Sequence, residues 1–511
     1  MRYSEHNHVI IARERQRSTA PSSRSIEYAL ATVVVIVALG AWVVYLRDGL
    51  VLSHYDAKAH LVVARRVIDS LTPGWRQFGA VWLPLPHLLQ MFPTQIDALY
   101  RTGAFGSLVS IACFGLSAWA IARLVLAATA SRLAAGASTA LLVANPNLLY
   151  VHTTPMTEPL LIAAVLVTVL WIFEWLARSP ETNSPSKLGG ILFVAAWTRY
   201  EAWPIIAMAI AATAVVFWSR GHSVKSIAVQ VWRLGRWPVA AAALFLLNSR
   251  VTVGAWLVSS GFYVRDPTYD GLATKVALAI WWGTHRLGGY VVEIVALTTA
   301  ALLIIRALAR RADAPLVVIV ALFASATVPA FAFYEGHPFR IRYMVPLACA
   351  CIPLCGIAIG RQTNPVSRAL LAVVLVVSAV IESPPWNRQA PLLVESQLDA
   401  SNSAGRQVVT RCLAMGYRGE KVMASMGSLA HYMQELSHEG FAIRDFIHEG
   451  NGAIWDLALE TGPALHAGWM LVEEQAEGGD ALAERVRRTP MFVSRMTRVC
   501  EGGGVALYRR E

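Results

Sequence analysis

The sequence predicts an all-α polytopic membrane domain of about eleven transmembrane helices, followed by a C-terminal soluble α/β domain. Of the 511 residues, 56% are hydrophobic and only 15% are charged, against roughly 25% charged in an ordinary soluble domain. Many apolar stretches approach the ~20 residues that a helix needs to cross a membrane. These stretches stop after residue 383.

The first apolar stretch has no small-residue cleavage site after it, so we expect an uncleaved span and not a signal peptide. The predicted spans are 28–46, 99–126, 133–150, 159–177, 188–203, 204–218, 237–256, 288–308, 315–333, 344–360 and 369–383. Together they define a membrane domain over 28–383, preceded by a polar, Arg-rich tail over 1–27.

Lys and Arg residues favour a cytoplasmic N-terminus, because the loops on that side carry more of them than the opposite loops. This orientation places the C-terminal domain outside the cytoplasm. A net charge of +11 is explained by helix ends at the cytoplasmic surface, so it does not indicate a nucleic-acid partner. In the exterior domain, compartment alone predicts a disulfide between Cys412 and Cys500.

The ionisable motifs fall in the exterior segments. In the long segment 47–98, apolar residues recur at helical spacing over 56–71, which predicts an amphipathic helix lying in the membrane interface. Prolines interrupt a second interfacial piece at 81–89. The turn before span 159–177 contains Glu158, with Thr157 as the expected helix cap. Three further turns or loops lie at 197–204, 258–287 and 334–343.

The C-terminal region reads as a linker over 384–402 and an α/β domain over 403–511. Strand-like pieces occur at 421–424, 440–443, 469–473, 492–499 and 504–509. Helix-like pieces occur at 428–436 and 480–488. No glycine-rich phosphate loop and no metal-spaced cysteine pair stands out in this region.

Asp56 has two interpretations. It could form a variant capping box with Ser53 at the start of a helix. However, the other exterior turns also hold acids and bases close to apolar boundaries, where polar groups are expensive and usually functional. We therefore expect Asp56 to be a general base and Glu158 to be a second acid of the same site.

Transfer of a sugar from a lipid phosphate needs a carboxylate that takes a proton from the acceptor, and cations that stabilise the departing phosphate. The candidate residues for binding the substrate and donor phosphate are Lys58, His60, Arg199, Tyr200, Glu201, Arg265, His337, Arg340, Arg342 and Tyr343. Asp56 and His60 share a helix face, so a divalent metal is conceivable. Two ligands do not define a metal site, and we assign none.

A transporter or flippase of a polyprenyl-linked substrate is the main alternative. It predicts ionisable residues near the bilayer midplane and related halves with broken helices. Glu293 is the one acid well inside a predicted span, and no internal repeat is detectable. A ligase or a non-catalytic scaffold with a substrate-binding exterior domain also stays open.

Several motifs together resemble the GT-C superfamily of membrane glycosyltransferases. They are the Asp-bearing first exterior segment, Trp-Leu-Pro-Leu-Pro-His at 82–87, Pro-Met-Thr-Glu at 155–158, Thr-Arg-Tyr-Glu-Ala-Trp at 198–203 and Arg-Tyr-Met-Val-Pro at 342–346. The chain looks most similar to bacterial members related to protein O-mannosyltransferases and lipid A aminoarabinose transferases. Ala57 follows Asp56, where the mannosyltransferases have an Asp-Glu pair.

The resemblance implies a polyprenyl-phosphate-linked sugar donor and inverting transfer on the exterior face, with Asp56 as the base. It implies an integral protein of the bacterial inner membrane that acts in the cell envelope among membrane lipids. The acceptor, whether protein, lipid or glycan, stays open.

Overall fold

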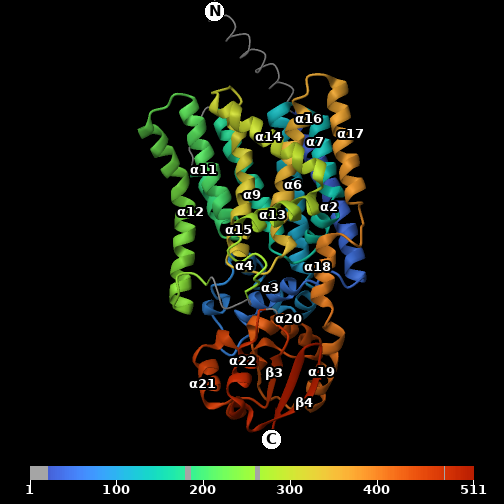
Figure 1. The fold of residues 1–511 in the computed structure, drawn as a ribbon, viewed down its shortest axis with the longest axis vertical. Helices are drawn as coiled ribbons and strands as arrows, with labels where there is room; N and C mark the ends of the chain where they lie inside the picture. Colours follow the sequence, from blue (N-terminus) through green and yellow to red (C-terminus); the bar gives the residue numbers. More distant parts are fainter. Residues whose placement is uncertain (1–20, 179–185, 259–264, 477) are drawn as a thin grey trace, which may run out of the picture.

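The computed structural model describes residues 21–178, 186–258, 265–476 and 478–511. It has two parts (Figure 1): an elongated bundle of helices and, at one end of the bundle, a smaller domain built on a β-sheet. The predicted fold class is therefore confirmed. Of the predicted tail 1–27, residues 1–20 lie outside the described ranges, and helix α2 already begins at Pro21.

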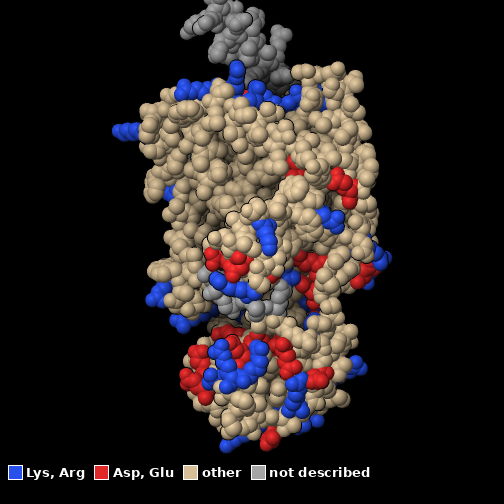
Figure 2. All heavy atoms as spheres, in the orientation of Figure 1, with Lys and Arg blue, Asp and Glu red and all other residues tan. Residues whose placement is uncertain are grey.

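Eight helical segments in the described part of the chain are long and apolar enough to cross a membrane. They lie in α2 (Pro21–Arg47), α6 (Ala104–Thr129), α9 (Glu158–Ala177), α11 (Ala202–Ser219), α14 (Tyr290–Leu308), η3 with α15 (Ala314–Ala326, Thr327–Tyr334), η4 with α16 (Ile341–Met344, Val345–Gly360) and α17 (Pro365–Glu382). One face of the bundle shows a broad belt with few charged side chains, and Lys and Arg gather at the edge far from the sheet domain (Figure 2).

The other three predicted spans are also helical. They correspond to α7 (Arg132–Ala144) with α8 (Pro146–Val151), to α10 (Ser186–Ala196) and to α12 (Val224–Val253). Helices α7 and α10 have only 13 and 11 residues, and α12 contains Pro238. The predicted loop 258–287 includes helix α13 (Ala273–Gly288), while its residues 259–264 lie outside the described ranges.

The segment between α2 and α6 forms short helices at the end of the bundle that faces the sheet domain (Figure 1). They are α3 (Tyr55–Arg66), η1 (Trp75–Phe78), α4 (Leu85–Gln90), η2 (Pro93–Gln95) and α5 (Asp97–Thr102). Ten of the twelve residues of α3 are buried, because the helix packs on helix α20 (Met426–Leu436) of the sheet domain and on the short helices α4, η1 and η2 at the end of the bundle. This helix is therefore sandwiched between the two parts, and not one-sided as its amphipathic pattern suggests.

The sheet domain contains five strands in the order β2-β1-β3-β5-β4. They are β1 (Val422–Ala424), β2 (Phe446–Ile447), β3 (Trp469–Glu473), β4 (Met496–Gly502) and β5 (Val505–Arg510). Strand β1 is parallel to β2 and β3, whereas β5 is antiparallel to β3 and β4. The stretch 440–443, predicted as a strand, is not one; the strand lies three residues later because 3-10 helix η6 (Ile443–Asp445) intervenes.

The remaining helices of this region are α18 (Pro391–Ala400), α19 (Ser403–Gly416), α21 (Ala453–Thr461) and α22 (Ala481–Arg488). The short 3-10 turns are η5 (Ser437–Glu439), η7 (Glu449–Asn451), η8 (Pro463–Leu465) and η9 (Pro490–Val493). Helix α18 lies within the predicted linker 384–402, so about half of that stretch is helical. A disulfide joins Cys412 of α19 to Cys500 of β4, as predicted.

Candidate active site

The start of helix α3 places Asp56 at the boundary between the bundle and the sheet domain. His54, and not Ser53, is the N-cap: its Nδ1 accepts a hydrogen bond of 3.1 Å from the Asp56 backbone N–H. The Ser53 hydroxyl is instead hydrogen-bonded to the Leu50 carbonyl at 2.8 Å. The Asp56 side chain therefore does not cap this helix. Asp56 is only 4% exposed.

Arg342 is the principal partner of Asp56. It comes from the turn η4 that leads into α16, and its Nη1 contacts Asp56 Oδ2 directly. The same Nη1 lies 4.0 Å from Glu158 Oε1. The guanidinium also lies over the ring of the adjacent Tyr343, 5.3 Å from its centroid, so one arginine joins its own turn to two distant parts of the sequence.

Glu158 and Arg199 form the second half of the cluster. Glu158 begins helix α9 and is fully buried, with Oε1 3.1 Å from Arg199 Nη1. Arg199 Nη2 also lies 2.9 Å from Glu201 Oε1. Thr157, predicted as a helix cap, makes no capping bond and accepts a hydrogen bond of 2.7 Å from Arg199 Nη1.

Electrostatics at the cluster favour the ionised forms of Asp56 and Arg199. Burial disfavours the charged form of Asp56, but the Arg342 guanidinium, with His60 and His54, outweighs it and lowers the pKa of this carboxyl. Burial opposes the positive charge of Arg199, and Glu158 and Glu201 more than compensate, which raises its pKa. Both groups are therefore charged at neutral pH.

His337, Arg340 and Tyr343 lie at the edge of the cluster. The Tyr343 hydroxyl is 3.3 Å from His337 Nε2. Arg340 Nη1 is 3.6 Å from Asp399 Oδ1. Burial lowers the pKa of His337, so its ring is neutral at pH 7.

Two predicted site residues, Lys58 and Arg265, pair with other acids. Lys58 points to the sheet domain, with Nζ 2.5 Å from Glu435 Oε1. Arg265 is exposed and lies 3.7 Å from Asp270 and from Glu335. Neither side chain contacts Asp56 or Glu158 directly.

Tyr200 and His60 both contact the segment 81–87. The Tyr200 hydroxyl donates a 3.1 Å hydrogen bond to the Val81 carbonyl. His60 lies one turn after Asp56, but its Nδ1 is 3.0 Å from His87 Nε2, and its ring packs 4.4 Å from that of Trp82. Burial and His87 hold the pKa of His60 well below its usual range.

Three residues at the cluster were not predicted from the sequence: His54, Glu395 and Asp399. The two acids lie in the stretch assigned to a linker. His54 Nε2 is 3.4 Å from Glu395 Oε1, and its Nδ1 is 3.3 Å from Asp399 Oδ2. The spacing of these acids by four residues was the available signal, because such a pair shares a helix face.

No group of three or more His, Cys, Asp or Glu side chains within the described ranges could hold a metal ion. The cluster offers carboxylates and guanidinium groups. Such a set can move a proton and stabilise an anion.

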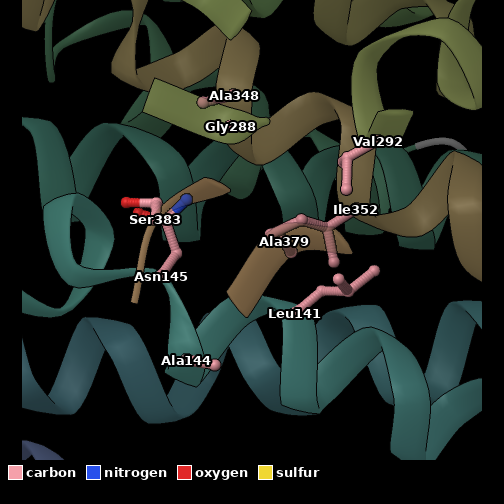
Figure 3. A pocket seen from close by; sticks show the side chains of 9 residues that line it. All are labelled: Leu141, Ala144, Asn145, Gly288, Val292, Ala348, Ile352, Ala379 and Ser383. Carbon is pink, nitrogen blue, oxygen red and sulfur yellow. The ribbon is translucent and has the colours of Figure 1, made fainter. Parts of the chain in front are cut away.

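Two hollows lie outside the cluster. Figure 3 shows a small one inside the bundle, lined by Leu141, Ala144, Asn145, Gly288, Val292, Ala348, Ile352, Ala379 and Ser383. A second, of about 480 Å³, is lined by Trp75, Arg76, Pro84, Trp197, Leu244, Phe245, Leu247, Asn248, Val251 and Thr252. The second is mostly apolar, and Trp197 in its wall stands two residues before Arg199.

The chain is similar to solved structures along nearly its whole length. One is ArnT from Cupriavidus metallidurans bound to undecaprenyl phosphate, at 10% identity and a TM-score of 0.55, over 93% of this chain and 97% of that chain. Another is the apo state of the same protein, at 12% identity and a TM-score of 0.56, over 94% and 98%. The chain has the ArnT fold. The GT-C resemblance is thereby confirmed at the level of the fold, and the chain is a multi-pass integral membrane protein.

The likeness is not visible in sequence comparisons. No family model matches the chain, and no curated protein matches it significantly. At identities of 10 and 12%, the ArnT structures establish the fold alone.

Proposed function

We propose that the chain transfers a sugar from a polyprenyl-phosphate donor to an acceptor on the exterior face of the membrane, with Asp56 as general base. The observation that carries the proposal is the convergence of Asp56, Glu158, Arg199 and Arg342 in one buried cluster at the end of the bundle. The shared fold with ArnT, which was solved with undecaprenyl phosphate bound, supports the donor class.

In the proposed reaction, an acceptor hydroxyl attacks the anomeric carbon of the sugar and gives its proton to Asp56. The bond between that carbon and the phosphate oxygen breaks, and the polyprenyl phosphate leaves with the electron pair. Arg342 and Arg199 stabilise the negative charge of the departing phosphate. Inversion at the anomeric carbon follows from a single displacement.

The Asp56–Arg342 contact implies that the donor binds before Asp56 takes up a proton. In the absence of donor, Arg342 lowers the pKa of Asp56 and makes it a weak base. A donor phosphate competes for the guanidinium, and burial then favours protonation of the carboxyl. Donor binding therefore activates the base.

Glu158 is suited to orient a sugar or acceptor hydroxyl. Its carboxylate is close to two guanidinium groups, yet neither oxygen accepts a hydrogen bond from any described residue. A buried carboxylate with spare acceptor capacity is costly unless a ligand uses it.

The second hollow, which we call the apolar groove, is proposed to receive the polyprenyl chain. It has the volume of an ordinary ligand site. Tyr200 packs on Phe245 of its wall, with ring centroids 5.9 Å apart, and directly precedes Glu201, the partner of Arg199. A lipid in the groove can thus present its phosphate to the cluster.

The exterior placement of the site is supported by two features. The Cys412–Cys500 disulfide lies in the sheet domain, and disulfides persist in oxidising compartments. Lys and Arg gather at the opposite end of the bundle, as the positive-inside rule expects of a cytoplasmic surface (Figure 2).

The proposal is tested with Asp56→Asn in the purified full-length chain. The donors are a panel of undecaprenyl-phosphate-linked sugars, a bacterial membrane extract supplies acceptors, and release of undecaprenyl phosphate is measured. Loss of a general base predicts a 10²- to 10⁴-fold lower rate with donor binding retained. Asp48→Asn, at a surface ion pair with Arg388, is the control.

Unchanged release by Asp56→Asn would eliminate Asp56 as the base. Movement of intact lipid-linked sugar across vesicles, with no release of undecaprenyl phosphate by the wild-type chain, would establish the transporter instead.

A further inference from the structure

Helix α18 carries two carboxylates, Glu395 and Asp399, that the proposed reaction does not use. They are four residues apart and therefore project from one face of the helix. Each side chain is only 12% exposed. Burying two acids side by side is costly unless both are well paired, so their contacts indicate what they do.

Glu395 joins the segment that carries Asp56 to the segment that carries Arg342. Its Oε1 lies 3.4 Å from His54 Nε2 and 3.9 Å from Arg342 Nε. Its Oε2 accepts a 2.9 Å hydrogen bond from the backbone N–H of Ile341. The carboxylate thus fixes the residue next to Arg342 through the backbone.

Asp399 makes the same connection one turn further along α18. Its Oδ2 accepts a 3.2 Å hydrogen bond from the backbone N–H of Tyr55, the residue before Asp56. Its Oδ1 lies 3.6 Å from Arg340 Nη1. Both acids therefore span the same two segments.

Helix α18 is itself fixed to the bundle. The backbone N–H of Leu392 donates a 3.1 Å hydrogen bond to Asn147 Oδ1. The Ser396 hydroxyl, between the two acids, lies 3.1 Å from that of Ser53. The helix that carries the carboxylates is thus hydrogen-bonded both to the bundle and to the segment before Asp56.

We propose that Glu395 and Asp399 are positioning residues that hold Asp56 and Arg342 in the arrangement required for sugar transfer. The inference rests on the proposed function. Neither acid touches the Asp56 carboxylate; both act through the backbone and side chains beside it. Because a misplacement of about 1 Å at a reacting group can cost about 100-fold in rate, loss of this support lowers the rate of the chemical step.

The test compares Glu395→Gln, Glu395→Met and Asp399→Asn in the full-length chain, assayed for release of undecaprenyl phosphate. The amides keep the size and an acceptor oxygen, so we expect a roughly 10-fold lower kcat; the Met side chain lacks an acceptor, so we expect a roughly 100-fold loss. The donor KM stays within about threefold because the lipid chain binds away from α18. Glu460→Gln, an exposed acid on α21, is the control.

A merely structural role predicts that melting temperature, kcat and KM change together. If the Met variant does not fold, the two amide variants decide the question. Wild-type kcat in Glu395→Gln and Asp399→Asn, with the wild-type chain active, would overturn the positioning role alone. If the wild-type chain releases no undecaprenyl phosphate from any donor, the proposed function itself fails.

Discussion

The Arg342 guanidinium contacts the Asp56 carboxylate directly, and both residues are more than nine-tenths buried. The ion pair therefore has little solvent screening, and each group depends on the other for compensation of its charge. This dependence makes the pair sensitive to the loss of one partner and much less sensitive to the loss of both.

Arg342→Met is expected to lower the free energy of unfolding by about 3–5 kcal/mol, because it leaves a buried carboxylate without its main counter-charge. It should also lower the rate of undecaprenyl phosphate release at least 100-fold. Thermal denaturation and the release assay measure the two effects. Adding Asp56→Asn should recover stability but not activity.

The control for that change is Arg388→Met, at an ion pair with Asp48 whose arginine side chain is 77% exposed. Exposed pairs contribute about 1 kcal/mol or less. Equal losses of stability in the two arginine variants would contradict the dependence of Asp56 on Arg342.

Stability should fall as the pH is lowered from about 6.5 toward 3. Burial lowers the pKa of His87, His431 and His448 from 6.5 to about 3. Between these values the unfolded chain binds protons on the three rings and the folded chain does not, so acid favours unfolding. Each ring contributes up to about 1.4 kcal/mol per pH unit.

Melting temperatures between pH 8 and pH 5 measure this effect. His448→Asn should reduce the slope below pH 6.5. A flat stability profile between pH 6.5 and 5 would show that these rings can ionise in the folded chain.

The sheet domain should depend more on Glu435 than on Lys58. Glu435 accepts hydrogen bonds of 2.9 and 3.1 Å from the buried Arg406 and also pairs with Lys58. Glu435→Ala leaves the buried Arg406 without its carboxylate partner and is expected to lower the free energy of unfolding by about 3–5 kcal/mol. Lys58→Met should lower it by about 1 kcal/mol. Thermal unfolding measures both, with the exposed Glu439→Gln as control.

The same Lys58→Met variant tests the sequence-based interpretation of this lysine as a ligand of the donor phosphate. Because Lys58 points to Glu435, the donor KM should remain unchanged. A tenfold increase in KM without loss of stability would favour the phosphate role.

Filling the apolar groove should weaken donor binding. Leu244 lines the groove on α12, so Leu244→Trp is expected to raise the donor KM about tenfold or more by excluding the lipid chain. Val239→Trp is the matched control, because Val239 lies on the same helix, is similarly exposed and does not line the groove. Equal KM values in the two variants would place the lipid elsewhere.

The sequence allowed prediction of the membrane helices and of the acids and arginines at the ends of spans. Asp56, Glu158, Arg199 and Arg342 all stand next to apolar runs, where a charge is unusual enough to indicate a site. Lys58 was grouped with Asp56 by nearness in sequence, whereas in the structure its side chain pairs with Glu435. Two residues along a helix turn the side chain by roughly 200°, which directs Lys58 away from Asp56.

Helix α18 could not be found from hydrophobic runs, because it has only ten residues and its inward side combines Leu392, Leu393 and Ser396 with the two carboxylates. Its pairing with His54, Tyr55 and Ile341 depends on segments that lie 54 to 344 residues away in the sequence. Strand β2 was misplaced for a related reason: it has only two residues, too few for an alternating pattern to define it.

The position of α18 in the chain decides how the protein can be divided. A chain cut after the last membrane helix at Glu382 would keep Asp56 and Arg342 but lose Glu395 and Asp399, which bind the segments around them. Chimeras that exchange the sheet domain should therefore be joined beyond Ala400, so that α18 stays in the same chain segment as the membrane helices.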